Sequence, residues 1–389
     1  MIKSTVILYF LLSILYNTYS LQSINTNFLP KADYIQPWFC EYWTTEQWET
    51  HINKMISAGY NELIIQGSID IRETSIEIFY NSAYFRIEAK KRNLELHDFS
   101  TMYDKIFEAI KNVNKEFYIS MGLTTFHEWN TRCISDPDFY EIIMNFEKNC
   151  VKEILSSDLF KSNRKYISSF YSVYEMYDFD LPDDYEDGKW FISDKEKAWA
   201  NYFTEIIEYI DSFKDVEIPL FFSPYHSAYY HPSNETEYRI WRNFFSIAKF
   251  RAIDAIAPQD HFGFMGSEYT ENDMKTCKNH LIAIKKACEE YSAAQFWINN
   301  EIFTKDYQTA DFSRVKKQFE INEELRPKKV ISFSFSHYGV GHEPFYSQYI
   351  DYHKTLLNPP LTERTNFSRW RGLSRVCQFI LIIAIINYY

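Results

Sequence analysis

Eight short apolar runs alternate with amphipathic helical patterns along most of this 389-residue chain. Runs of β-branched and aromatic residues of this length are typical of buried strands. Strands that alternate with helices form parallel βαβ units, and eight such units predict a closed (β/α)8 TIM barrel as a single domain. The strands are expected at 33–43, 61–66, 117–124, 165–174, 218–223, 253–257, 294–298 and 329–335.

The helical segments between these strands support the same architecture. Thr44 and Gln47 form a capping-box pattern at the start of the first helix, which ends at Gly59. An open doubly wound sheet is the alternative, but no glycine-rich phosphate-binding motif follows the first strand, and the chain has only 9 glycines. The other helices are expected at 100–114, 138–156, 194–211, 235–252, 270–291, 312–325 and 345–357.

The N-terminus has the pattern of a secretory signal peptide. Lys3 precedes an apolar run at 6–16, and small residues end the segment at Ser20, where cleavage is expected. This assigns 1–20 to a leader and 30–358 to the barrel. The apolar run is too short for a convincing membrane span.

Residues 359–389 form a spacer followed by a hydrophobic tail. The tail resembles a signal for a GPI lipid anchor, with Asn366 or Ser368 near the cut site, and would attach the protein to a membrane. The alternative is an apolar tail that packs or frays. The sequence thus predicts a protein that is secreted or held at the extracellular surface. The glycosylation sequons that begin at Asn234 and Asn366 agree with secretion.

Charge and cysteine spacing exclude several classes of protein. The net charge of −12 leaves no basic patch for phosphates, so no nucleic-acid partner is expected. The six cysteines match no zinc or disulfide framework. Cys277 and Cys288 lie on one expected helix, roughly 16 Å apart along its axis, too far for a disulfide. Without the tail, five cysteines remain, so at least one is unpaired.

Polar and aromatic side chains gather near the carboxyl ends of the expected strands. In a TIM barrel these ends surround the active site. Amides, carboxylates and imidazoles bind hydroxyl groups, and aromatic rings at the mouth, such as Trp38, Trp129 and Trp297, stack on the apolar face of a sugar. The pattern predicts an oligosaccharide or glycan substrate, bound by Trp38, Gln66, His127, Glu128, Trp129, Tyr177, Tyr225, Gln259, Asp260, Trp297, Asn300, His337 and Tyr338.

Two glutamates, Glu175 after the fourth strand and Glu301 after the seventh, are the candidate catalytic residues. Glycoside cleavage needs one carboxyl group that protonates the leaving oxygen and a second that attacks or activates water. A single glutamate at a strand end is more often a helix cap or an ion-pair partner. A pair on strands that face each other across the barrel favours catalysis. Asp260 is the chief rival, as an acid, a ligand contact or a cap.

No metal or cofactor site is predicted. His127 and Glu128 lack the second histidine of a zinc helix, and His342 with Glu343 lacks further ligands beyond His337. The acidic loop 178–187 lacks EF-hand spacing and is expected to be a solvated lid. Cys40 has no base paired with it and is expected to be a buried, inert thiol.

The order and spacing of several segments resemble domain-of-unknown-function family 4434, a family regarded as glycoside-hydrolase-like barrels. The resemblance covers about 34–357 and rests on Trp48 with 58–66, 170–175, 256–260, 297–303 and 335–338. More distantly, glutamates after strands four and seven resemble the large clan of retaining glycosidases. That resemblance implies that Glu175 is the acid/base and Glu301 the nucleophile. In that clan asparagine usually precedes the strand-four glutamate, whereas here Tyr174 does.

The sequence therefore supports three hypotheses. The first is a glycoside hydrolase that is secreted or held at the cell surface. The second is a carbohydrate-binding barrel without catalytic activity. The third is a surface adhesion or structural protein that uses its aromatic side chains for protein contacts.

Overall fold

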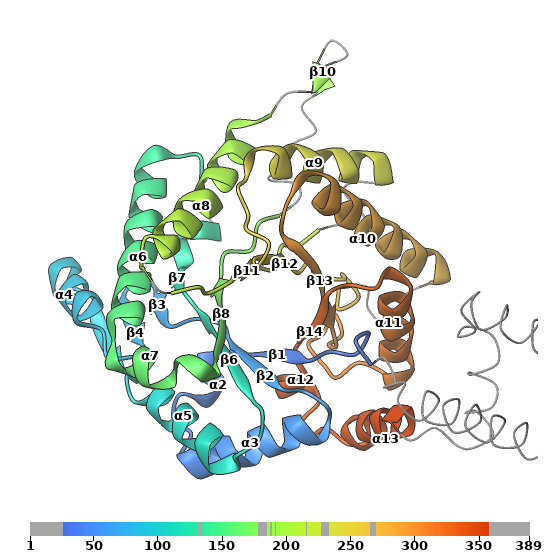
Figure 1. Ribbon diagram of the computed structural model, residues 1–389, viewed down its shortest axis with the longest axis horizontal. Coiled ribbons are helices and arrows are strands. Elements are labelled where there is room, and N and C mark those ends of the chain that lie inside the picture. Colours follow the sequence, from blue (N-terminus) through green and yellow to red (C-terminus); the bar gives the residue numbers. More distant parts are fainter. Residues whose placement is uncertain are drawn as a thin grey trace, which may run out of the picture. The chain divides into compact units, whose positions relative to one another are not determined.

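Eight parallel strands close into a barrel in the computed structural model, as the sequence predicts (Figure 1). The structure describes residues 26–130, 132, 134–177, 185–186, 189–190, 192–214, 216–226, 233–264 and 270–357. The strands pair in chain order, and the last pairs with the first. They are β1 (Ala32–Ile35), β2 (Glu62–Ile65), β6 (Tyr118–Gly122), β8 (Ile167–Ser172), β11 (Leu220–Phe222), β12 (Ala255–Ile256), β13 (Gln295–Glu301) and β14 (Lys329–Phe333).

Helices surround this barrel, which lies in a compact unit of residues 27–348 (Figure 1). The capping box at Thr44 is confirmed, because its hydroxyl accepts from the Gln47 N–H and the Gln47 side chain accepts from the Thr44 N–H. No helix in the described part of the chain has both the length and the apolar character needed to cross a bilayer. The longer helices are α3 (Thr45–Ser57), α5 (Met102–Val113), α6 (Pro137–Ser156), α8 (Asp194–Asp211), α9 (Asn234–Ile247), α10 (Glu271–Tyr291), α11 (Phe312–Leu325) and α13 (Phe345–Leu357).

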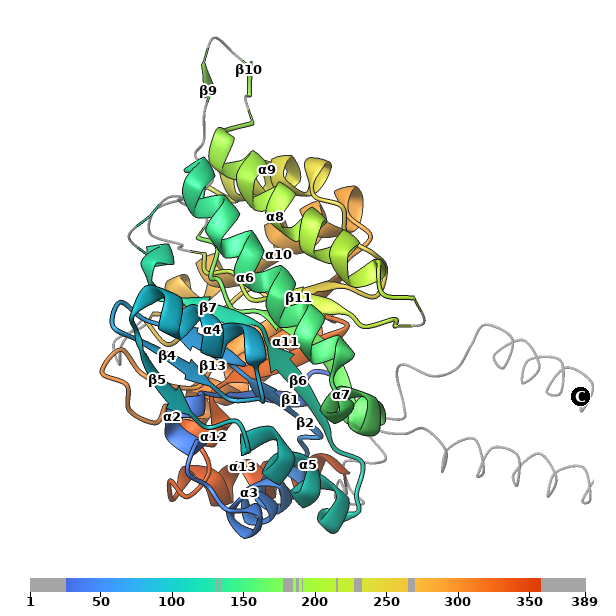
Figure 2. The same ribbon diagram turned by 90° about the vertical axis from the view of Figure 1, so that its left-hand side faces the viewer.

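A second, four-stranded sheet is inserted between β2 and β6 and continues after β6. Its order is β5 (Glu95–Asp98), β4 (Ser75–Ile78), β3 (Ile69–Ile71) and β7 (Thr124–Phe126). Figure 2 shows this sheet with helix α4 (Ala83–Arg92) beside it. This sheet was not predicted. The third strand expected at 117–124 covers two strands in the structure, β6 and the start of β7.

The barrel interior is filled by large side chains. Rings follow one another across it, with centroids 5.0 Å apart for Tyr34 and Tyr171, 5.0 Å for Tyr171 and Phe221, and 5.2 Å for Phe221 and Trp297. Val173 belongs to the same buried cluster. Because alternate residues of a strand face the same side, this packing fixes which later residues of β8 and β13 point inward.

The amino-terminal end of the barrel is closed by a charged pair. The Lys329 ammonium lies 2.5 Å from the Glu62 carboxylate and 4.5 Å from the centre of the Trp297 ring. The Ser120 hydroxyl donates to the same carboxylate at 2.6 Å. These contacts satisfy charges that would otherwise be buried without partners.

Asp33 on β1 joins the two ends of the barrel sheet. Its buried carboxylate accepts from the Ser332 hydroxyl at 2.5 Å, the Phe335 N–H at 2.6 Å and the Ser336 N–H at 2.7 Å. Both N–H groups belong to the start of the short helix α12 (Phe335–Tyr338), where backbone donors lack helical partners. One carboxylate therefore ties β1 to β14 and to the following helix.

Several expectations fall outside the described residues. They are the leader 1–20, the tail 359–389, the sequon at Asn366, and Cys133 and Cys377. Of the acidic loop 178–187, residues 185–186 form β9, which pairs with β10 (Lys189–Trp190), and the rest lies outside. The other cysteines, Cys40, Cys150, Cys277 and Cys288, are buried and free.

Candidate active site

Glu175 lies just past the end of β8 and on the inward side. Tyr171 and Val173, two and four residues earlier, pack in the barrel interior, so the same alternation directs Glu175 inward. Its carboxylate accepts one hydrogen bond, from the Gln259 amide at 3.1 Å. The side chain is partly accessible, yet dense surrounding protein raises its pKa from the usual 4.5 to about 7.

Tyr174 points the opposite way. It is buried, its hydroxyl lies 3.3 Å from that of Thr124, and its ring contacts Tyr202 on α8. The residue before Glu175 therefore packs against the outer helices, and it does not line the barrel mouth.

Glu301, the last residue of β13, shares the inward face with Trp297 and Asn299. It is only 1% exposed. Burial and the nearby negative charge of Asp260 raise the pKa of Glu301 to about 8, and the Glu175 charge acts in the same direction. The charge of Glu175 therefore reaches Glu301 across the barrel.

A backbone donor supports the ionised form of Glu301. The Gly263 N–H donates to its carboxylate at 2.6 Å. A side chain at position 263 could not be accommodated, because a Cβ there would lie 2.8 Å from that carboxylate and 2.5 Å from the Phe303 ring. Buried Arg314 on α11 donates to the carbonyl of Glu301, and its positive charge lowers the Glu301 pKa.

Asp260 and Asn300 lie behind β13, between the strand and α11, and not at the mouth. The Asp260 carboxylate accepts from the Asn300 amide at 2.8 Å, the Gln318 amide at 2.6 Å, and the backbone N–H groups of Glu301 and Phe262. Both residues are 1% exposed. The structure therefore differs from the expectation that they contact substrate, and it makes Asp260 a fixed charge that positions the Glu301 backbone.

An aromatic rim surrounds the mouth above the two glutamates. Trp129 stacks on Tyr177 at 5.9 Å, and Tyr177 contacts Tyr225 at 5.5 Å. Further ring contacts link Tyr225 to Phe264, Phe264 to Phe303, and Phe303 to Tyr338 at the end of α12. These rings follow seven of the eight strands. Trp38 and Phe264 are exposed, Phe303 is buried, and the others are half-buried. The rim consists of Trp38, Trp129, Tyr177, Tyr225, Phe264, Phe303, His337 and Tyr338.

The remaining predicted contacts occupy different positions. Gln66 follows β2 and is half-buried. His127 binds Asp70 of the second sheet at 2.7 Å, and this hydrogen bond raises its pKa; Glu128 is exposed and pairs with Arg132. Trp297 lies deep inside the barrel, where its indole N–H donates to Gln295, and so it is not at the mouth.

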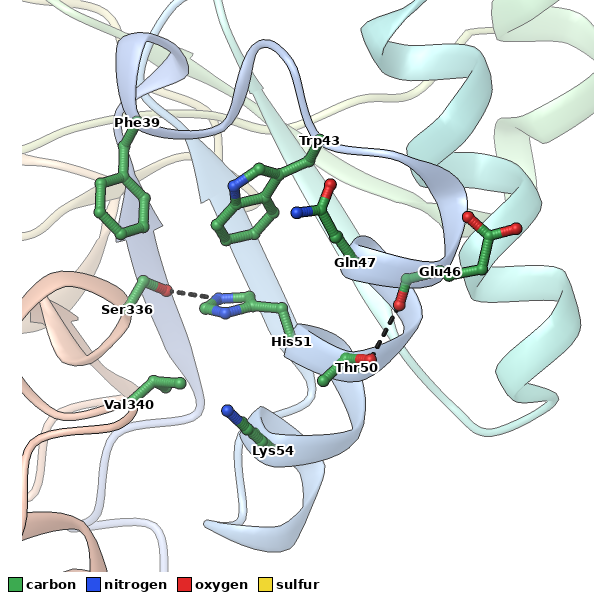
Figure 3. Close-up of a pocket in the computed structure, with 9 residues that line it drawn as sticks. All are labelled: Phe39, Trp43, Glu46, Gln47, Thr50, His51, Lys54, Ser336 and Val340. Atoms are coloured by element: carbon green, nitrogen blue, oxygen red, sulfur yellow. Dashed lines mark hydrogen bonds between the residues drawn. The ribbon is translucent and has the colours of Figure 1, made fainter.

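A separate hollow of about 430 Å³ lies between α3 and α12 (Figure 3). His51 and the Ser336 hydroxyl meet there at 3.0 Å. Burial lowers the pKa of His51 to about 3, so the ring is neutral. Figure 3 shows Glu46 pointing away from His51. A serine and a histidine without an orienting carboxylate do not form a catalytic triad.

The eight parallel strands and the helices around them define a (β/α)8 TIM barrel, a fold also seen in solved glycosidases. A candidate alpha-L-fucosidase from Bacteroides thetaiotaomicron has a similar fold, with a TM-score of 0.60 and 16% identity over 86% of this chain and 96% of that one. A beta-galactosidase from Marinomonas ef1 matches with a TM-score of 0.50 and 7% identity over 84% of this chain and 59% of that longer one. These likenesses concern the fold.

The chain belongs to the family described as domain of unknown function DUF4434, whose model matches residues 32–345. No protein of curated function matches the sequence. The family resemblance noted in the sequence is confirmed.

Proposed function

We propose that this protein is a glycoside hydrolase that cleaves a glycan with Glu175 and Glu301. The observation that carries the proposal is the pair of inward, electrostatically coupled glutamates beneath an aromatic rim. The fold of the neighbouring glycosidases supports it.

Glu175 is suited to the role of general acid. Its pKa of about 7 keeps it protonated in mildly acidic solution, and among the described residues it accepts a hydrogen bond only from Gln259, which leaves the carboxyl able to turn toward a leaving oxygen. It would protonate the glycosidic oxygen as the bond to the anomeric carbon breaks.

Glu301 is suited to the role of nucleophile. The Gly263 N–H and the nearby Arg314 charge favour its carboxylate form. In a retaining reaction it would attack the anomeric carbon to form a glycosyl ester. Water, deprotonated by Glu175, would then release the sugar and restore both groups.

One observation favours a second candidate, a carbohydrate-binding barrel without catalytic activity. Glu301 is 1% exposed and its pKa is raised to about 8, so the free protein holds a covered and largely protonated carboxyl group at neutral pH. Binding at the rim requires neither property to change, whereas attack by Glu301 requires that this carboxyl become ionised and accessible to a ligand.

Hydrolysis assays on a panel of glycans at pH 5–9 separate the two candidates. The proposal expects turnover by the wild type and loss of at least about a thousandfold in Glu301→Gln, since removal of a catalytic group of this kind costs several kcal/mol. Glu320→Gln, an exposed change on α11, is the matched control. Unchanged activity in Glu301→Gln would exclude the assignment, and glycan binding without turnover on any substrate would favour the second candidate.

A positive readout is also available. Azide should restore turnover of an activated aryl glycoside to Glu175→Ala, because the variant lacks only the proton donor and base. NMR of the first sugar released should show the anomeric configuration of the substrate, as a covalent intermediate on Glu301 requires. The opposite anomer would indicate that Glu301 activates water directly.

We also propose that the protein acts outside the cell. The leader pattern at 1–20 and the sequon at Asn234, which lies exposed at the start of α9, support this proposal. Release of the protein from intact cells by a phosphatidylinositol-specific phospholipase would indicate a lipid anchor on the C-terminal tail, whereas its presence in the medium would indicate secretion.

A further inference from the structure

Three buried side chains with metal-binding atoms meet behind the wall of the barrel. His226 follows β11, Glu237 is on α9, and His280 is on α10. One potential ligand atom from each lies within 4.8 Å of the other two. The Nδ1 atom of His280 is 3.5 Å from a Glu237 carboxylate oxygen. All three residues are fully buried.

Ordinary core packing does not account for this cluster. Neither ring nitrogen of His280 has a hydrogen-bond partner within the described part of the chain, and the same is true of the Glu237 oxygen that faces it. Buried polar groups without partners are rare and unfavourable. At 3.5 Å the two groups are too far apart for a good hydrogen bond, so they do not satisfy each other.

We propose that His226, Glu237 and His280 bind a divalent transition-metal ion, with Zn²⁺ as the best fit. Two imidazoles and one carboxylate form a donor set that zinc prefers. In a tetrahedral zinc site with bonds of about 2.0–2.1 Å, neighbouring ligand atoms are roughly 3.4 Å apart. The separation of 3.5 Å matches this value, and the other ligand atoms, which lie within 4.8 Å, would have to move closer by at most about 1.4 Å.

The surroundings are those of a prepared site. The other carboxylate oxygen of Glu237 accepts from the buried Trp241 indole N–H at 2.7 Å, which turns the free oxygen toward the histidines. Such outer hydrogen bonds orient metal ligands in proteins. His261, also buried, has its ring centroid 6.2 Å from that of His226, compared with 5.8 Å between His226 and His280.

The ion would connect three elements that carry one side of the mouth. Helices α9 and α10 lie side by side outside β11 and β12 (Figure 1). Tyr225 of the aromatic rim directly precedes His226 in the chain. A metal held here would fix the loop after β11 against the two helices, so the site is structural and independent of the proposed hydrolysis.

Metal content and cobalt spectroscopy on the full chain test this proposal. The protein is stripped with a chelator and titrated with Co²⁺ alone and then Zn²⁺ alone. We expect one ion per chain, the intense visible absorption of tetrahedral cobalt, its loss on zinc addition, and a Tm increase on the order of 3 °C at a hundredfold excess over Kd. These measurements use the wild type, so they hold even where a variant fails to fold.

Variants then locate the ion. His280→Gln and Glu237→Gln should each weaken binding at least about tenfold, as the loss of one ligand does. His342→Gln, on the exposed loop after α12, is the matched control and should bind as the wild type does. No stoichiometric binding by the wild type would overturn the proposal, and so would binding that survives both ligand changes or that is lost in His342→Gln. A protein that binds no ion but gains stability at low pH would show a histidine–glutamate ion pair instead.

Discussion

Replacement of Glu175 by glutamine should remove a large part of the pH dependence of stability. Burial raises the pKa of this carboxyl from 4.5 to about 7. A carboxyl with a raised pKa in the folded state contributes stability that is present below pH 4.5 and is lost as the pH rises through 7, because the folded protein binds the proton more tightly than the unfolded chain does.

The size of the effect follows from the two pKa values. Between pH 5 and pH 8 this single group should lower the free energy of unfolding by at most about 2.5 kcal/mol, with 1.36 kcal/mol for each pKa unit. The partial accessibility of the side chain makes this an upper bound. Glutamine has nearly the same shape and cannot ionise. The free energy of unfolding of Glu175→Gln should therefore fall by that much less than the wild-type value between pH 5 and pH 8.

Urea unfolding at pH 5 and pH 8, followed by circular dichroism, measures the difference. Wild type, Glu175→Gln and the surface control Glu320→Gln are compared under identical salt. We expect the free energy of unfolding of Glu175→Gln, relative to that of the wild type, to be higher at pH 8 than at pH 5. The control should have the wild-type value at both pH values. Parallel pH profiles for wild type and Glu175→Gln would refute the assignment of a raised pKa to this carboxyl, and with it the basis for its role as an acid.

Three further predictions concern the mouth and the base of the barrel. Gly263→Ala should destabilise the fold by about 1–3 kcal/mol, because the added methyl group would overlap the Phe303 ring; unchanged urea midpoints would contradict this. Lys329→Met should cost about 3 kcal/mol, because it leaves Glu62 buried without its partner, and a second change, Glu62→Gln, should restore much of the loss. For any glycan that is cleaved, kcat/KM should peak between about pH 7 and pH 8, because Glu175 must be protonated and Glu301 ionised, and a flat profile to pH 9 would argue against this.

The architecture could be predicted from sequence because its signals are local. The bounds of α8 and α11 agree with the prediction at both ends, since their apolar residues repeat at the helical period. The inward direction of Glu301 followed from alternation along β13. The second sheet gave no such signal, because β3 and β4 are short, carry Asp70 and Glu77, and are held by pairing with distant strands.

The details of the site depended on information that the sequence does not carry. Strand β13 runs to Glu301, three residues beyond the predicted end, so Trp297 lies low in the barrel and not at the mouth. Arg314 acts through backbone carbonyls, which leave no sequence pattern. The cluster of His226, Glu237 and His280 comes from three separate elements whose spacing matches no metal motif.

The link from Asp33 to Ser332 and the start of α12 has a consequence for how the chain folds. The contact joins residues 299 positions apart, so the last seam of the sheet can form only after almost the whole polypeptide has left the ribosome. A nascent or truncated chain without β14 would present two unpaired strand edges, on β1 and β13, and such edges invite pairing between molecules. We therefore expect aggregation during synthesis to depend on this seam more than on any surface helix.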